Sequence, residues 1–123
     1  MTYSEYMEAK PITIVETPLF LKQASAIWDE DEQAELVDYV ARNPESGDLI
    51  QGTGGVRKLR WAGKGSGKRG GARVIYFYYH SEAPIYLLLA YAKGAQADLS
   101  PDQKKQVSAL TGVLKKHHAV KGD

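Results

Sequence analysis

The sequence predicts an α+β fold, a small antiparallel β-sheet meander with two N-terminal helices and one C-terminal helix. Apolar residues recur at helical spacing before Asn43 and after Ser100, whereas between these points their period falls to about two. The period-two segments are joined by short, glycine-rich or tight connections, which favour antiparallel hairpins. A chain of 123 residues can bury one core. We therefore expect one domain at residues 11–116, after a loose arm at 1–10 and before a polar tail at 117–123.

The N-terminal part predicts a strand followed by two helices. The segment Ile12–Thr17 is rich in β-branched residues, which favours a strand. Pro18 suits the first turn of a short helix. Asp29 can cap a second helix, with Glu32 at the capping-box position three residues later. Asn43-Pro44 ends that helix, because proline disfavours helical geometry in the residue before it.

Three strands and a last helix complete the predicted order β-α-α-β-β-β-α. The strands are expected at Val56–Trp61, Ala72–His80 and Pro84–Lys93. The third does not alternate in its first half, so we expect it to be covered on both faces. The last helix is marked by Ser100 as cap, with Pro101 at its first position and Gln103 at the capping-box position.

Composition excludes several classes of protein. There is no cysteine, so the chain has neither disulfides nor a thiolate metal site, and a reducing cytoplasm is the expected location. His117 and His118 are adjacent and diverge by about 100° on a helix, so no metal or cofactor is predicted. The longest apolar run, Ile85–Ala92, is too short to span a bilayer, and no membrane partner is expected.

Charge is strongly segregated along the chain although the net charge is only +1. Residues 28–48 contain eight acids and one arginine, whereas residues 49–81 contain no acid and seven cations. Such a basic block attracts polyanions and is typical of a phosphate-binding surface. Four of its cations are candidates for contacts with nucleic-acid phosphates: Arg57, Lys64, Lys68 and Arg69.

The glycine-rich connection does not match a nucleotide-binding loop. Gly65, Gly67 and Gly70 form a G-x-G-x-x-G pattern, but a dinucleotide site needs a helix after the last glycine, and here strands are predicted on both sides. A flexible loop carrying solubilising charge is the alternative interpretation. The continuation of positive charge into both flanking strands favours a phosphate-binding surface.

Strand alternation places Lys58 and Arg60 on one face of their strand. Antiparallel pairing is expected to bring Arg73, at the start of the next strand, close to them. Like charges side by side are unfavourable unless they share an anion. Guanidinium groups suit phosphate oxygens, and a lysine among cations releases its proton more readily. A solvated polar face remains the alternative.

These residues resemble the RelE/HigB toxins of bacterial toxin–antitoxin systems, most closely the HigB-like branch. The resemblance is carried by Gly52-Thr53-Gly54-Gly55-Val56-Arg57-Lys58-Leu59-Arg60, by Gly63 to Arg73 with Tyr76-Phe77, and by Leu87 to Lys93 with Asp98-Leu99. It implies a RelE-like fold and a ribosome-dependent endoribonuclease that cuts messenger RNA by attack of a 2′-hydroxyl on the adjacent phosphate. It also implies a cognate antitoxin as partner.

The resemblance implies four catalytic residues. Lys58 or Arg60 would assist proton transfer and charge stabilisation, while Arg73 would hold the scissile phosphate. Lys93 lies where RelE-type proteins place a further catalytic arginine. Leu99 and Ser100 stand where some relatives have a tyrosine that acts as base, so no base is identified, and Tyr91 is interpreted as a packed strand aromatic.

Two further functions are compatible with the sequence. A non-catalytic RNA- or DNA-binding domain would use the same basic surface electrostatically. The other is a degenerate toxin retained for antitoxin binding or transcriptional control. The absence of the tyrosine that acts as base in some relatives is compatible with such a protein.

Overall fold

The computed structural model describes residues 12–62, 71–96 and 98–119 of the chain. They form three helices and a five-stranded mixed sheet, and the predicted α+β class and element order are confirmed. The helices are α2 (Pro18–Ser25), α3 (Glu30–Arg42) and α4 (Pro101–His117). The strands are β1 (Ile14–Glu16), β2 (Asp48–Leu49), β3 (Val56–Trp61), β4 (Ala72–Phe77) and β5 (Ile85–Ala92). The predicted arm and the glycine-rich loop at 63–70 lie outside the described residues.

Local capping explains where the longer helices begin. Asp29 accepts a hydrogen bond from the Glu32 amide at 2.8 Å, and Glu32 accepts one from the Asp29 amide at 3.0 Å. Ser100 and Gln103 form the same reciprocal pair at the start of α4. Both predicted capping boxes are therefore confirmed, and each satisfies amides that the first helical turn leaves without partners.

The strand order in the sheet is β1-β5-β4-β3-β2. The three central strands form the predicted antiparallel meander, whereas β1 lies parallel to β5 at one edge. The short strand β2, which pairs with β3 at the other edge, was not predicted. It has only two residues, one polar and one apolar, which is too short a segment to show the alternating pattern that predicts a strand.

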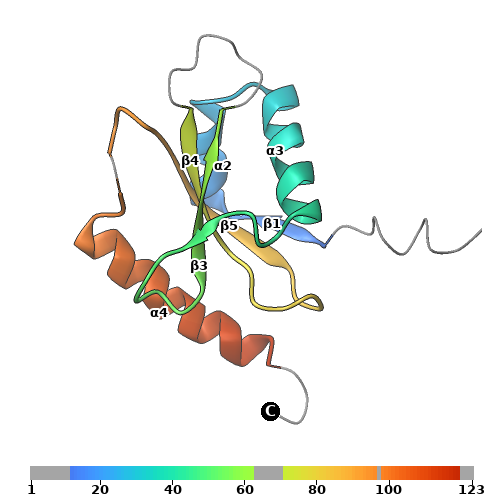
Figure 1. The fold of residues 1–123 in the computed structure, drawn as a ribbon, viewed down its shortest axis with the longest axis vertical. Coiled ribbons are helices and arrows are strands. Elements are labelled where there is room, and N and C mark those ends of the chain that lie inside the picture. Colours follow the sequence, from blue (N-terminus) through green and yellow to red (C-terminus); the bar gives the residue numbers. More distant parts are fainter. Residues whose placement is uncertain (1–11, 63–70, 97, 120–123) are drawn as a thin grey trace, which may run out of the picture.

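The sheet separates two hydrophobic clusters. Figure 1 shows the helices that cover them, with α2 and α3 on one side of the sheet and α4 on the other. The first cluster packs Phe20, Leu36 and Val40 against Leu59 and Tyr76. The second packs residues of β3, β4 and β5 against Val107 of α4.

Strand β5 is buried on both faces, as its lack of alternation predicted. A register shift in its pairing with β4 adds to the irregular pattern, because Ile75 pairs with Leu89 and Tyr76 with Leu87, which leaves Leu88 without a Cα partner in β4.

The glycine-rich segment before β3 seats α4 on the sheet. The Thr111 hydroxyl donates to the Thr53 carbonyl at 2.8 Å, and the Ser108 hydroxyl donates to the Gly52 carbonyl at 2.9 Å. Gly54 has a φ of +81°, and a Cβ atom there would lie 2.9 Å from the Thr111 hydroxyl oxygen. Glycine is therefore required both by the backbone conformation and by the close approach of α4.

The C-terminal end of α4 is tied to the sheet by histidines. The Glu82 amide donates to Nδ1 of His80, so Nε2 carries the proton and donates to the His118 carbonyl at 2.8 Å. Burial, with His117 and His80 nearby, lowers the pKa of His118. Its neutral ring can therefore accept a hydrogen bond from the Tyr86 hydroxyl, whose oxygen lies 2.6 Å from Nε2.

Among the helices of the described ranges, none has the length and apolar character needed to span a membrane.

Tyr76 and Phe77 are core residues, as expected of strand aromatics, and Tyr76 also fixes a loop. Its hydroxyl accepts from the Gly47 amide at 2.9 Å and donates to the Pro44 carbonyl at 2.8 Å. These bonds attach the segment that follows α3 to the central strand.

We predict that Tyr76→Phe lowers the free energy of unfolding by about 1–3 kcal/mol, because two backbone groups lose their buried partner. Chemical denaturation measures the change. Tyr78→Phe is the matched control: Tyr78 is half-buried against the same cluster, and its change should stay below about 0.5 kcal/mol. Equal losses in the two variants would contradict the role given to the Tyr76 hydroxyl.

Candidate functional site

Three cations meet on the face of the sheet that α4 partly covers. In the β3–β4 ladder Arg60 lies directly opposite Arg73, and Lys58 lies opposite Ile75. Ile75 belongs to the cluster under α4, so alternation places Lys58, Arg60 and Arg73 on that face as well. We call these three residues the cationic face.

The cationic face combines a rigid arginine with more accessible cations. Arg73 lies in the central strand and is only 9% exposed, whereas Arg60 is exposed and the Lys58 side chain is 30% exposed. Arg60 and Arg73 are paired in the ladder, so both positive charges belong to the same face of the sheet. The backbone ladder holds them together, so an anion placed between them would be bound without reorganising the strands.

Tyr91 completes this face from the neighbouring strand. It pairs with Arg73 across β4 and β5. It is 7% exposed and belongs to the cluster under α4, so the predicted packed aromatic is confirmed. Its hydroxyl is buried and makes no hydrogen bond within the described part of the chain. Burial raises the pKa of Tyr91 although Lys58 and Arg73 oppose that rise. At neutral pH the hydroxyl is therefore protonated and able to donate.

Asp98 is a residue of this site that the sequence predictions missed. Its carboxylate lies 2.5 Å from the Lys58 ammonium, across a separation of 40 residues along the chain. The hydrogen bond and the charge of Lys58 hold the pKa of the Asp98 carboxyl below its ordinary value. The basic segment contains no acid, but folding supplies one from the turn that follows β5. A signal was present in the sequence, since Asp98 follows the strand that was predicted beside Arg73.

The structure does not bring all predicted residues to the cationic face. Arg57 lies on the opposite face of β3, where its guanidinium donates to the Glu45 and Gly47 carbonyls at 3.1 and 2.8 Å. Lys93 lies just beyond β5, where it lines a small cavity of about 180 Å³ with Trp61 and Gly71 at the base of the β3–β4 hairpin. Lys64, Lys68 and Arg69 lie outside the described residues.

The chemistry available on this face is binding and stabilisation of negative charge. Lys58, Arg60 and Arg73 provide positive charge, and Tyr91 provides a neutral hydrogen-bond donor. Asp98 is anionic at neutral pH, and its lowered pKa makes it a weak proton acceptor. In the ranges that the structure describes, no three histidine, aspartate or glutamate side chains gather as metal ligands would.

Comparison with protein families identifies a family to which most of the chain is similar. The family described as "RelE toxin of RelE / RelB toxin-antitoxin system" matches residues 19–121, which is most of the chain. The match includes α2 after its first residue, α3, α4, the central strands and the whole cationic face.

We predict that the Asp98 carboxyl titrates below about 3.9, the ordinary value for an aspartate. Because the pKa of Asp98 is lowered in the folded state, the ion pair contributes fully to stability at pH values above the ordinary aspartate pKa. That contribution is lost as the pH falls through the lowered folded-state pKa. Carbon-detected NMR of the side-chain carboxyl gives the midpoint. In Lys58→Met the midpoint should rise toward the ordinary value, while Arg73 and Lys104 still lower it to a smaller extent. An unchanged midpoint would show that Lys58 is not its partner.

Proposed function

Because the chain belongs to the RelE family of toxins from toxin–antitoxin systems, we propose that it is a ribosome-dependent endoribonuclease that cuts messenger RNA. Toxins of this family are generally endoribonucleases that inhibit translation, and each is paired with an antitoxin of the RelB type. A closer relation to the HigB-like branch, carried by Gly52–Gly55 and by Lys64–Arg73, is part of this proposal. So is a cytoplasmic location, because that is where the ribosomes are.

The observation that carries the proposal is the direct opposition of Arg60 and Arg73 in the β3–β4 ladder. A phosphodiester that lies across both groups would be bound well, because each guanidinium can donate two parallel hydrogen bonds to its oxygens. RNA brings such a phosphate, and Tyr91 and Lys58 lie beside the same place.

In the proposed reaction the ribose 2′-oxygen attacks the adjacent phosphorus. A bond forms between the 2′-oxygen and phosphorus, and the bond between phosphorus and the 5′-oxygen breaks. The 2′-hydroxyl loses its proton, and the leaving 5′-oxygen gains one. Arg73 holds the scissile phosphate, and Lys58 or Arg60 assists the proton transfers and stabilises the charge that develops on the phosphoryl oxygens.

The ion pair between Lys58 and Asp98 bears on the role of the lysine. Asp98 keeps the ammonium close to the cationic face, and the RNA phosphate must compete with its carboxylate. Tyr91 suits donation to a phosphoryl oxygen better than proton abstraction, because its pKa is raised. We therefore propose that Asp98 orients Lys58 and that Tyr91 contributes to charge stabilisation.

The same ion pair favours a second candidate function. A toxin that has lost its catalytic base, and that binds RNA or antitoxin without cleavage, would also keep its cations together with a neutralising carboxylate. The two candidate functions differ in whether the wild-type protein cleaves messenger RNA. Only an active nuclease can lose cleavage when a residue of the cationic face is replaced.

Arg73→Ala is expected to lower cleavage of messenger RNA on purified ribosomes by about 100- to 1,000-fold, because the phosphate loses its buried cation. Ribosome binding should weaken only in part, since other cations remain. Primer extension across the cleaved message and co-sedimentation with ribosomes measure the two effects. Arg73→Lys keeps the charge and controls for unfolding, while Arg42→Ala, on α3, is a matched control that should cleave normally. Cleavage by Arg73→Ala at the wild-type rate would sink the proposed role.

Cleavage is expected to continue in EDTA when ribosome integrity is maintained with polyamines. The proposed chemistry uses protein cations in place of a metal ion, and the segment from Leu49 to Ser81 contains no carboxylate of the kind that magnesium prefers. Intact ribosomes, verified by sedimentation, are the control. Loss of cleavage on intact ribosomes would contradict the metal-independent mechanism while leaving the nuclease assignment in place.

A further inference from the structure

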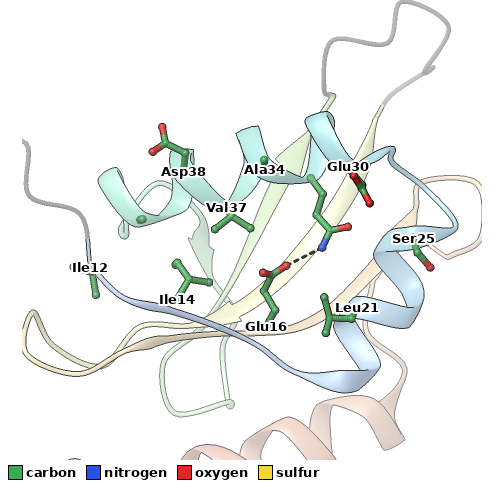
Figure 2. A pocket seen from close by; sticks show the side chains of 11 residues that line it. Ile12, Ile14, Glu16, Leu21, Ser25, Glu30, Ala34, Val37 and Asp38 are labelled. Carbon is green, nitrogen blue, oxygen red and sulfur yellow. Dashed lines mark hydrogen bonds between the residues drawn. The ribbon is translucent and has the colours of Figure 1, made fainter.

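A groove of about 750 Å³ lies between β1, α2 and α3, on the side of the sheet away from the cationic face. Figure 2 shows its lining side chains converging from these three elements. Its apolar floor includes Ile14 of β1, Leu21 of α2 and Val37 of α3. Leu21 is 44% exposed, so an apolar surface is open here. Uncovered apolar surface of this kind marks an interaction site when it is rimmed by polar residues.

The rim of the groove is acidic. Glu16 of β1 lies between Ile14 and Leu21 in Figure 2, and Glu30 stands at the first position of α3. Asp38 also lines the groove, but its carboxylate points away from the floor and pairs with Arg42 at 2.9 Å. The Gln33 amide donates to Glu16 at 2.7 Å and fixes that carboxylate in place. No lysine or arginine of the described ranges lines the groove. The electrostatic complement of this surface is therefore a positively charged segment with apolar side chains.

The groove is bordered by a sheet edge. Strand β1 pairs with β5 on one side, and within the described ranges no strand pairs with its other side. An edge strand offers backbone groups to an incoming segment, in addition to the side-chain contacts of the groove.

We infer that this acidic groove is the docking surface for a basic, amphipathic segment of the antitoxin. The inference rests on the toxin–antitoxin pairing in the proposed function and names the surface used by that partner. The segment seats apolar side chains on Ile14, Leu21 and Val37 and places lysine or arginine side chains beside Glu16 and Glu30. Docking there leaves the cationic face on the other side of the sheet, so the contact supplies affinity apart from the catalytic groups.

Other occupants fit the groove less well. RNA carries the same sign of charge as the rim and is repelled by it. The chain's own residues 1–11 contain Glu5 and Glu8 against Lys10, so their side chains bring no excess of positive charge. A second copy of the chain would have to present its cationic face, which the proposed function reserves for RNA.

The first test compares two exposed leucines of the same helix. Leu21→Ser removes apolar surface from the groove, whereas Leu19→Ser removes a side chain of similar exposure, 50%, that lies outside it. The probe is the purified RelB-type antitoxin encoded with this toxin, titrated by calorimetry. Leu21→Ser should weaken binding by about tenfold or more, and Leu19→Ser should stay within about twofold of the wild type.

The second test reverses the charge of the rim. Glu16→Lys combined with Glu30→Lys should weaken antitoxin binding by at least about tenfold, mainly through slower association. Asp31→Lys combined with Glu45→Lys is the matched control, since both residues are exposed acids outside the groove. All four variants should retain messenger RNA cleavage, which also shows that they fold, and antitoxin co-expression should no longer rescue growth from the two groove variants.

Three outcomes would overturn the inference. Wild-type antitoxin affinity in both groove variants would show that the antitoxin docks elsewhere. A changed sedimentation coefficient of the toxin alone in Leu21→Ser would identify the groove as a contact between two copies. Tighter antitoxin binding after removal of residues 1–11 would identify the chain's own N-terminal segment as the occupant. A wild-type protein that binds antitoxin through the groove but cleaves no message would refute the proposed nuclease activity and leave the docking inference intact.

Discussion

The antiparallel pairing of β3 with β4 is the constraint on which the arrangement of the site depends. It fixes Arg60 opposite Arg73, and β4 is flanked on its other side by β5, so the two arginines cannot separate without breaking the central ladder. Backbone hydrogen bonds and two hydrophobic clusters thus hold these two cations in place on one face of the sheet. That preorganisation is what a site for a developing negative charge requires, because no strand has to move when the anion arrives.

The sheet converts segregation of charge along the sequence into segregation in space. The acids that precede β3 belong largely to α3 and its flanks, on one face, whereas Lys58, Arg60 and Arg73 lie on the other. Each face has its own hydrophobic cluster and covering helix. One surface can therefore attract a polyanion while the other attracts a basic partner, although the net charge of the chain is only +1.

The candidate site could be predicted only in part from the sequence. Alternation along β3 placed Lys58 and Arg60 on one face because side chains of a strand have a period of two. The same alternation, applied to Arg57, places it on the other face, where it binds the loop after α3. Strand alternation does not predict the contact of Lys58 with Asp98, because that contact depends on where the turn between β5 and α4 lies. A site assembled from distant segments follows from packing, which local pattern does not contain.

The sequence by itself determined the helices and the central strands. Capping boxes such as Asp29–Glu32 and the two-residue period of β3 act over a few residues, so their physics is complete within the local segment. Only the tertiary structure decided that β1 lies parallel to β5 at the sheet edge, that β2 joins the other edge, and that Asp98 meets Lys58. Those choices depend on burial and pairing between segments far apart in the chain, and they created both the acidic groove and the ion pair of the cationic face.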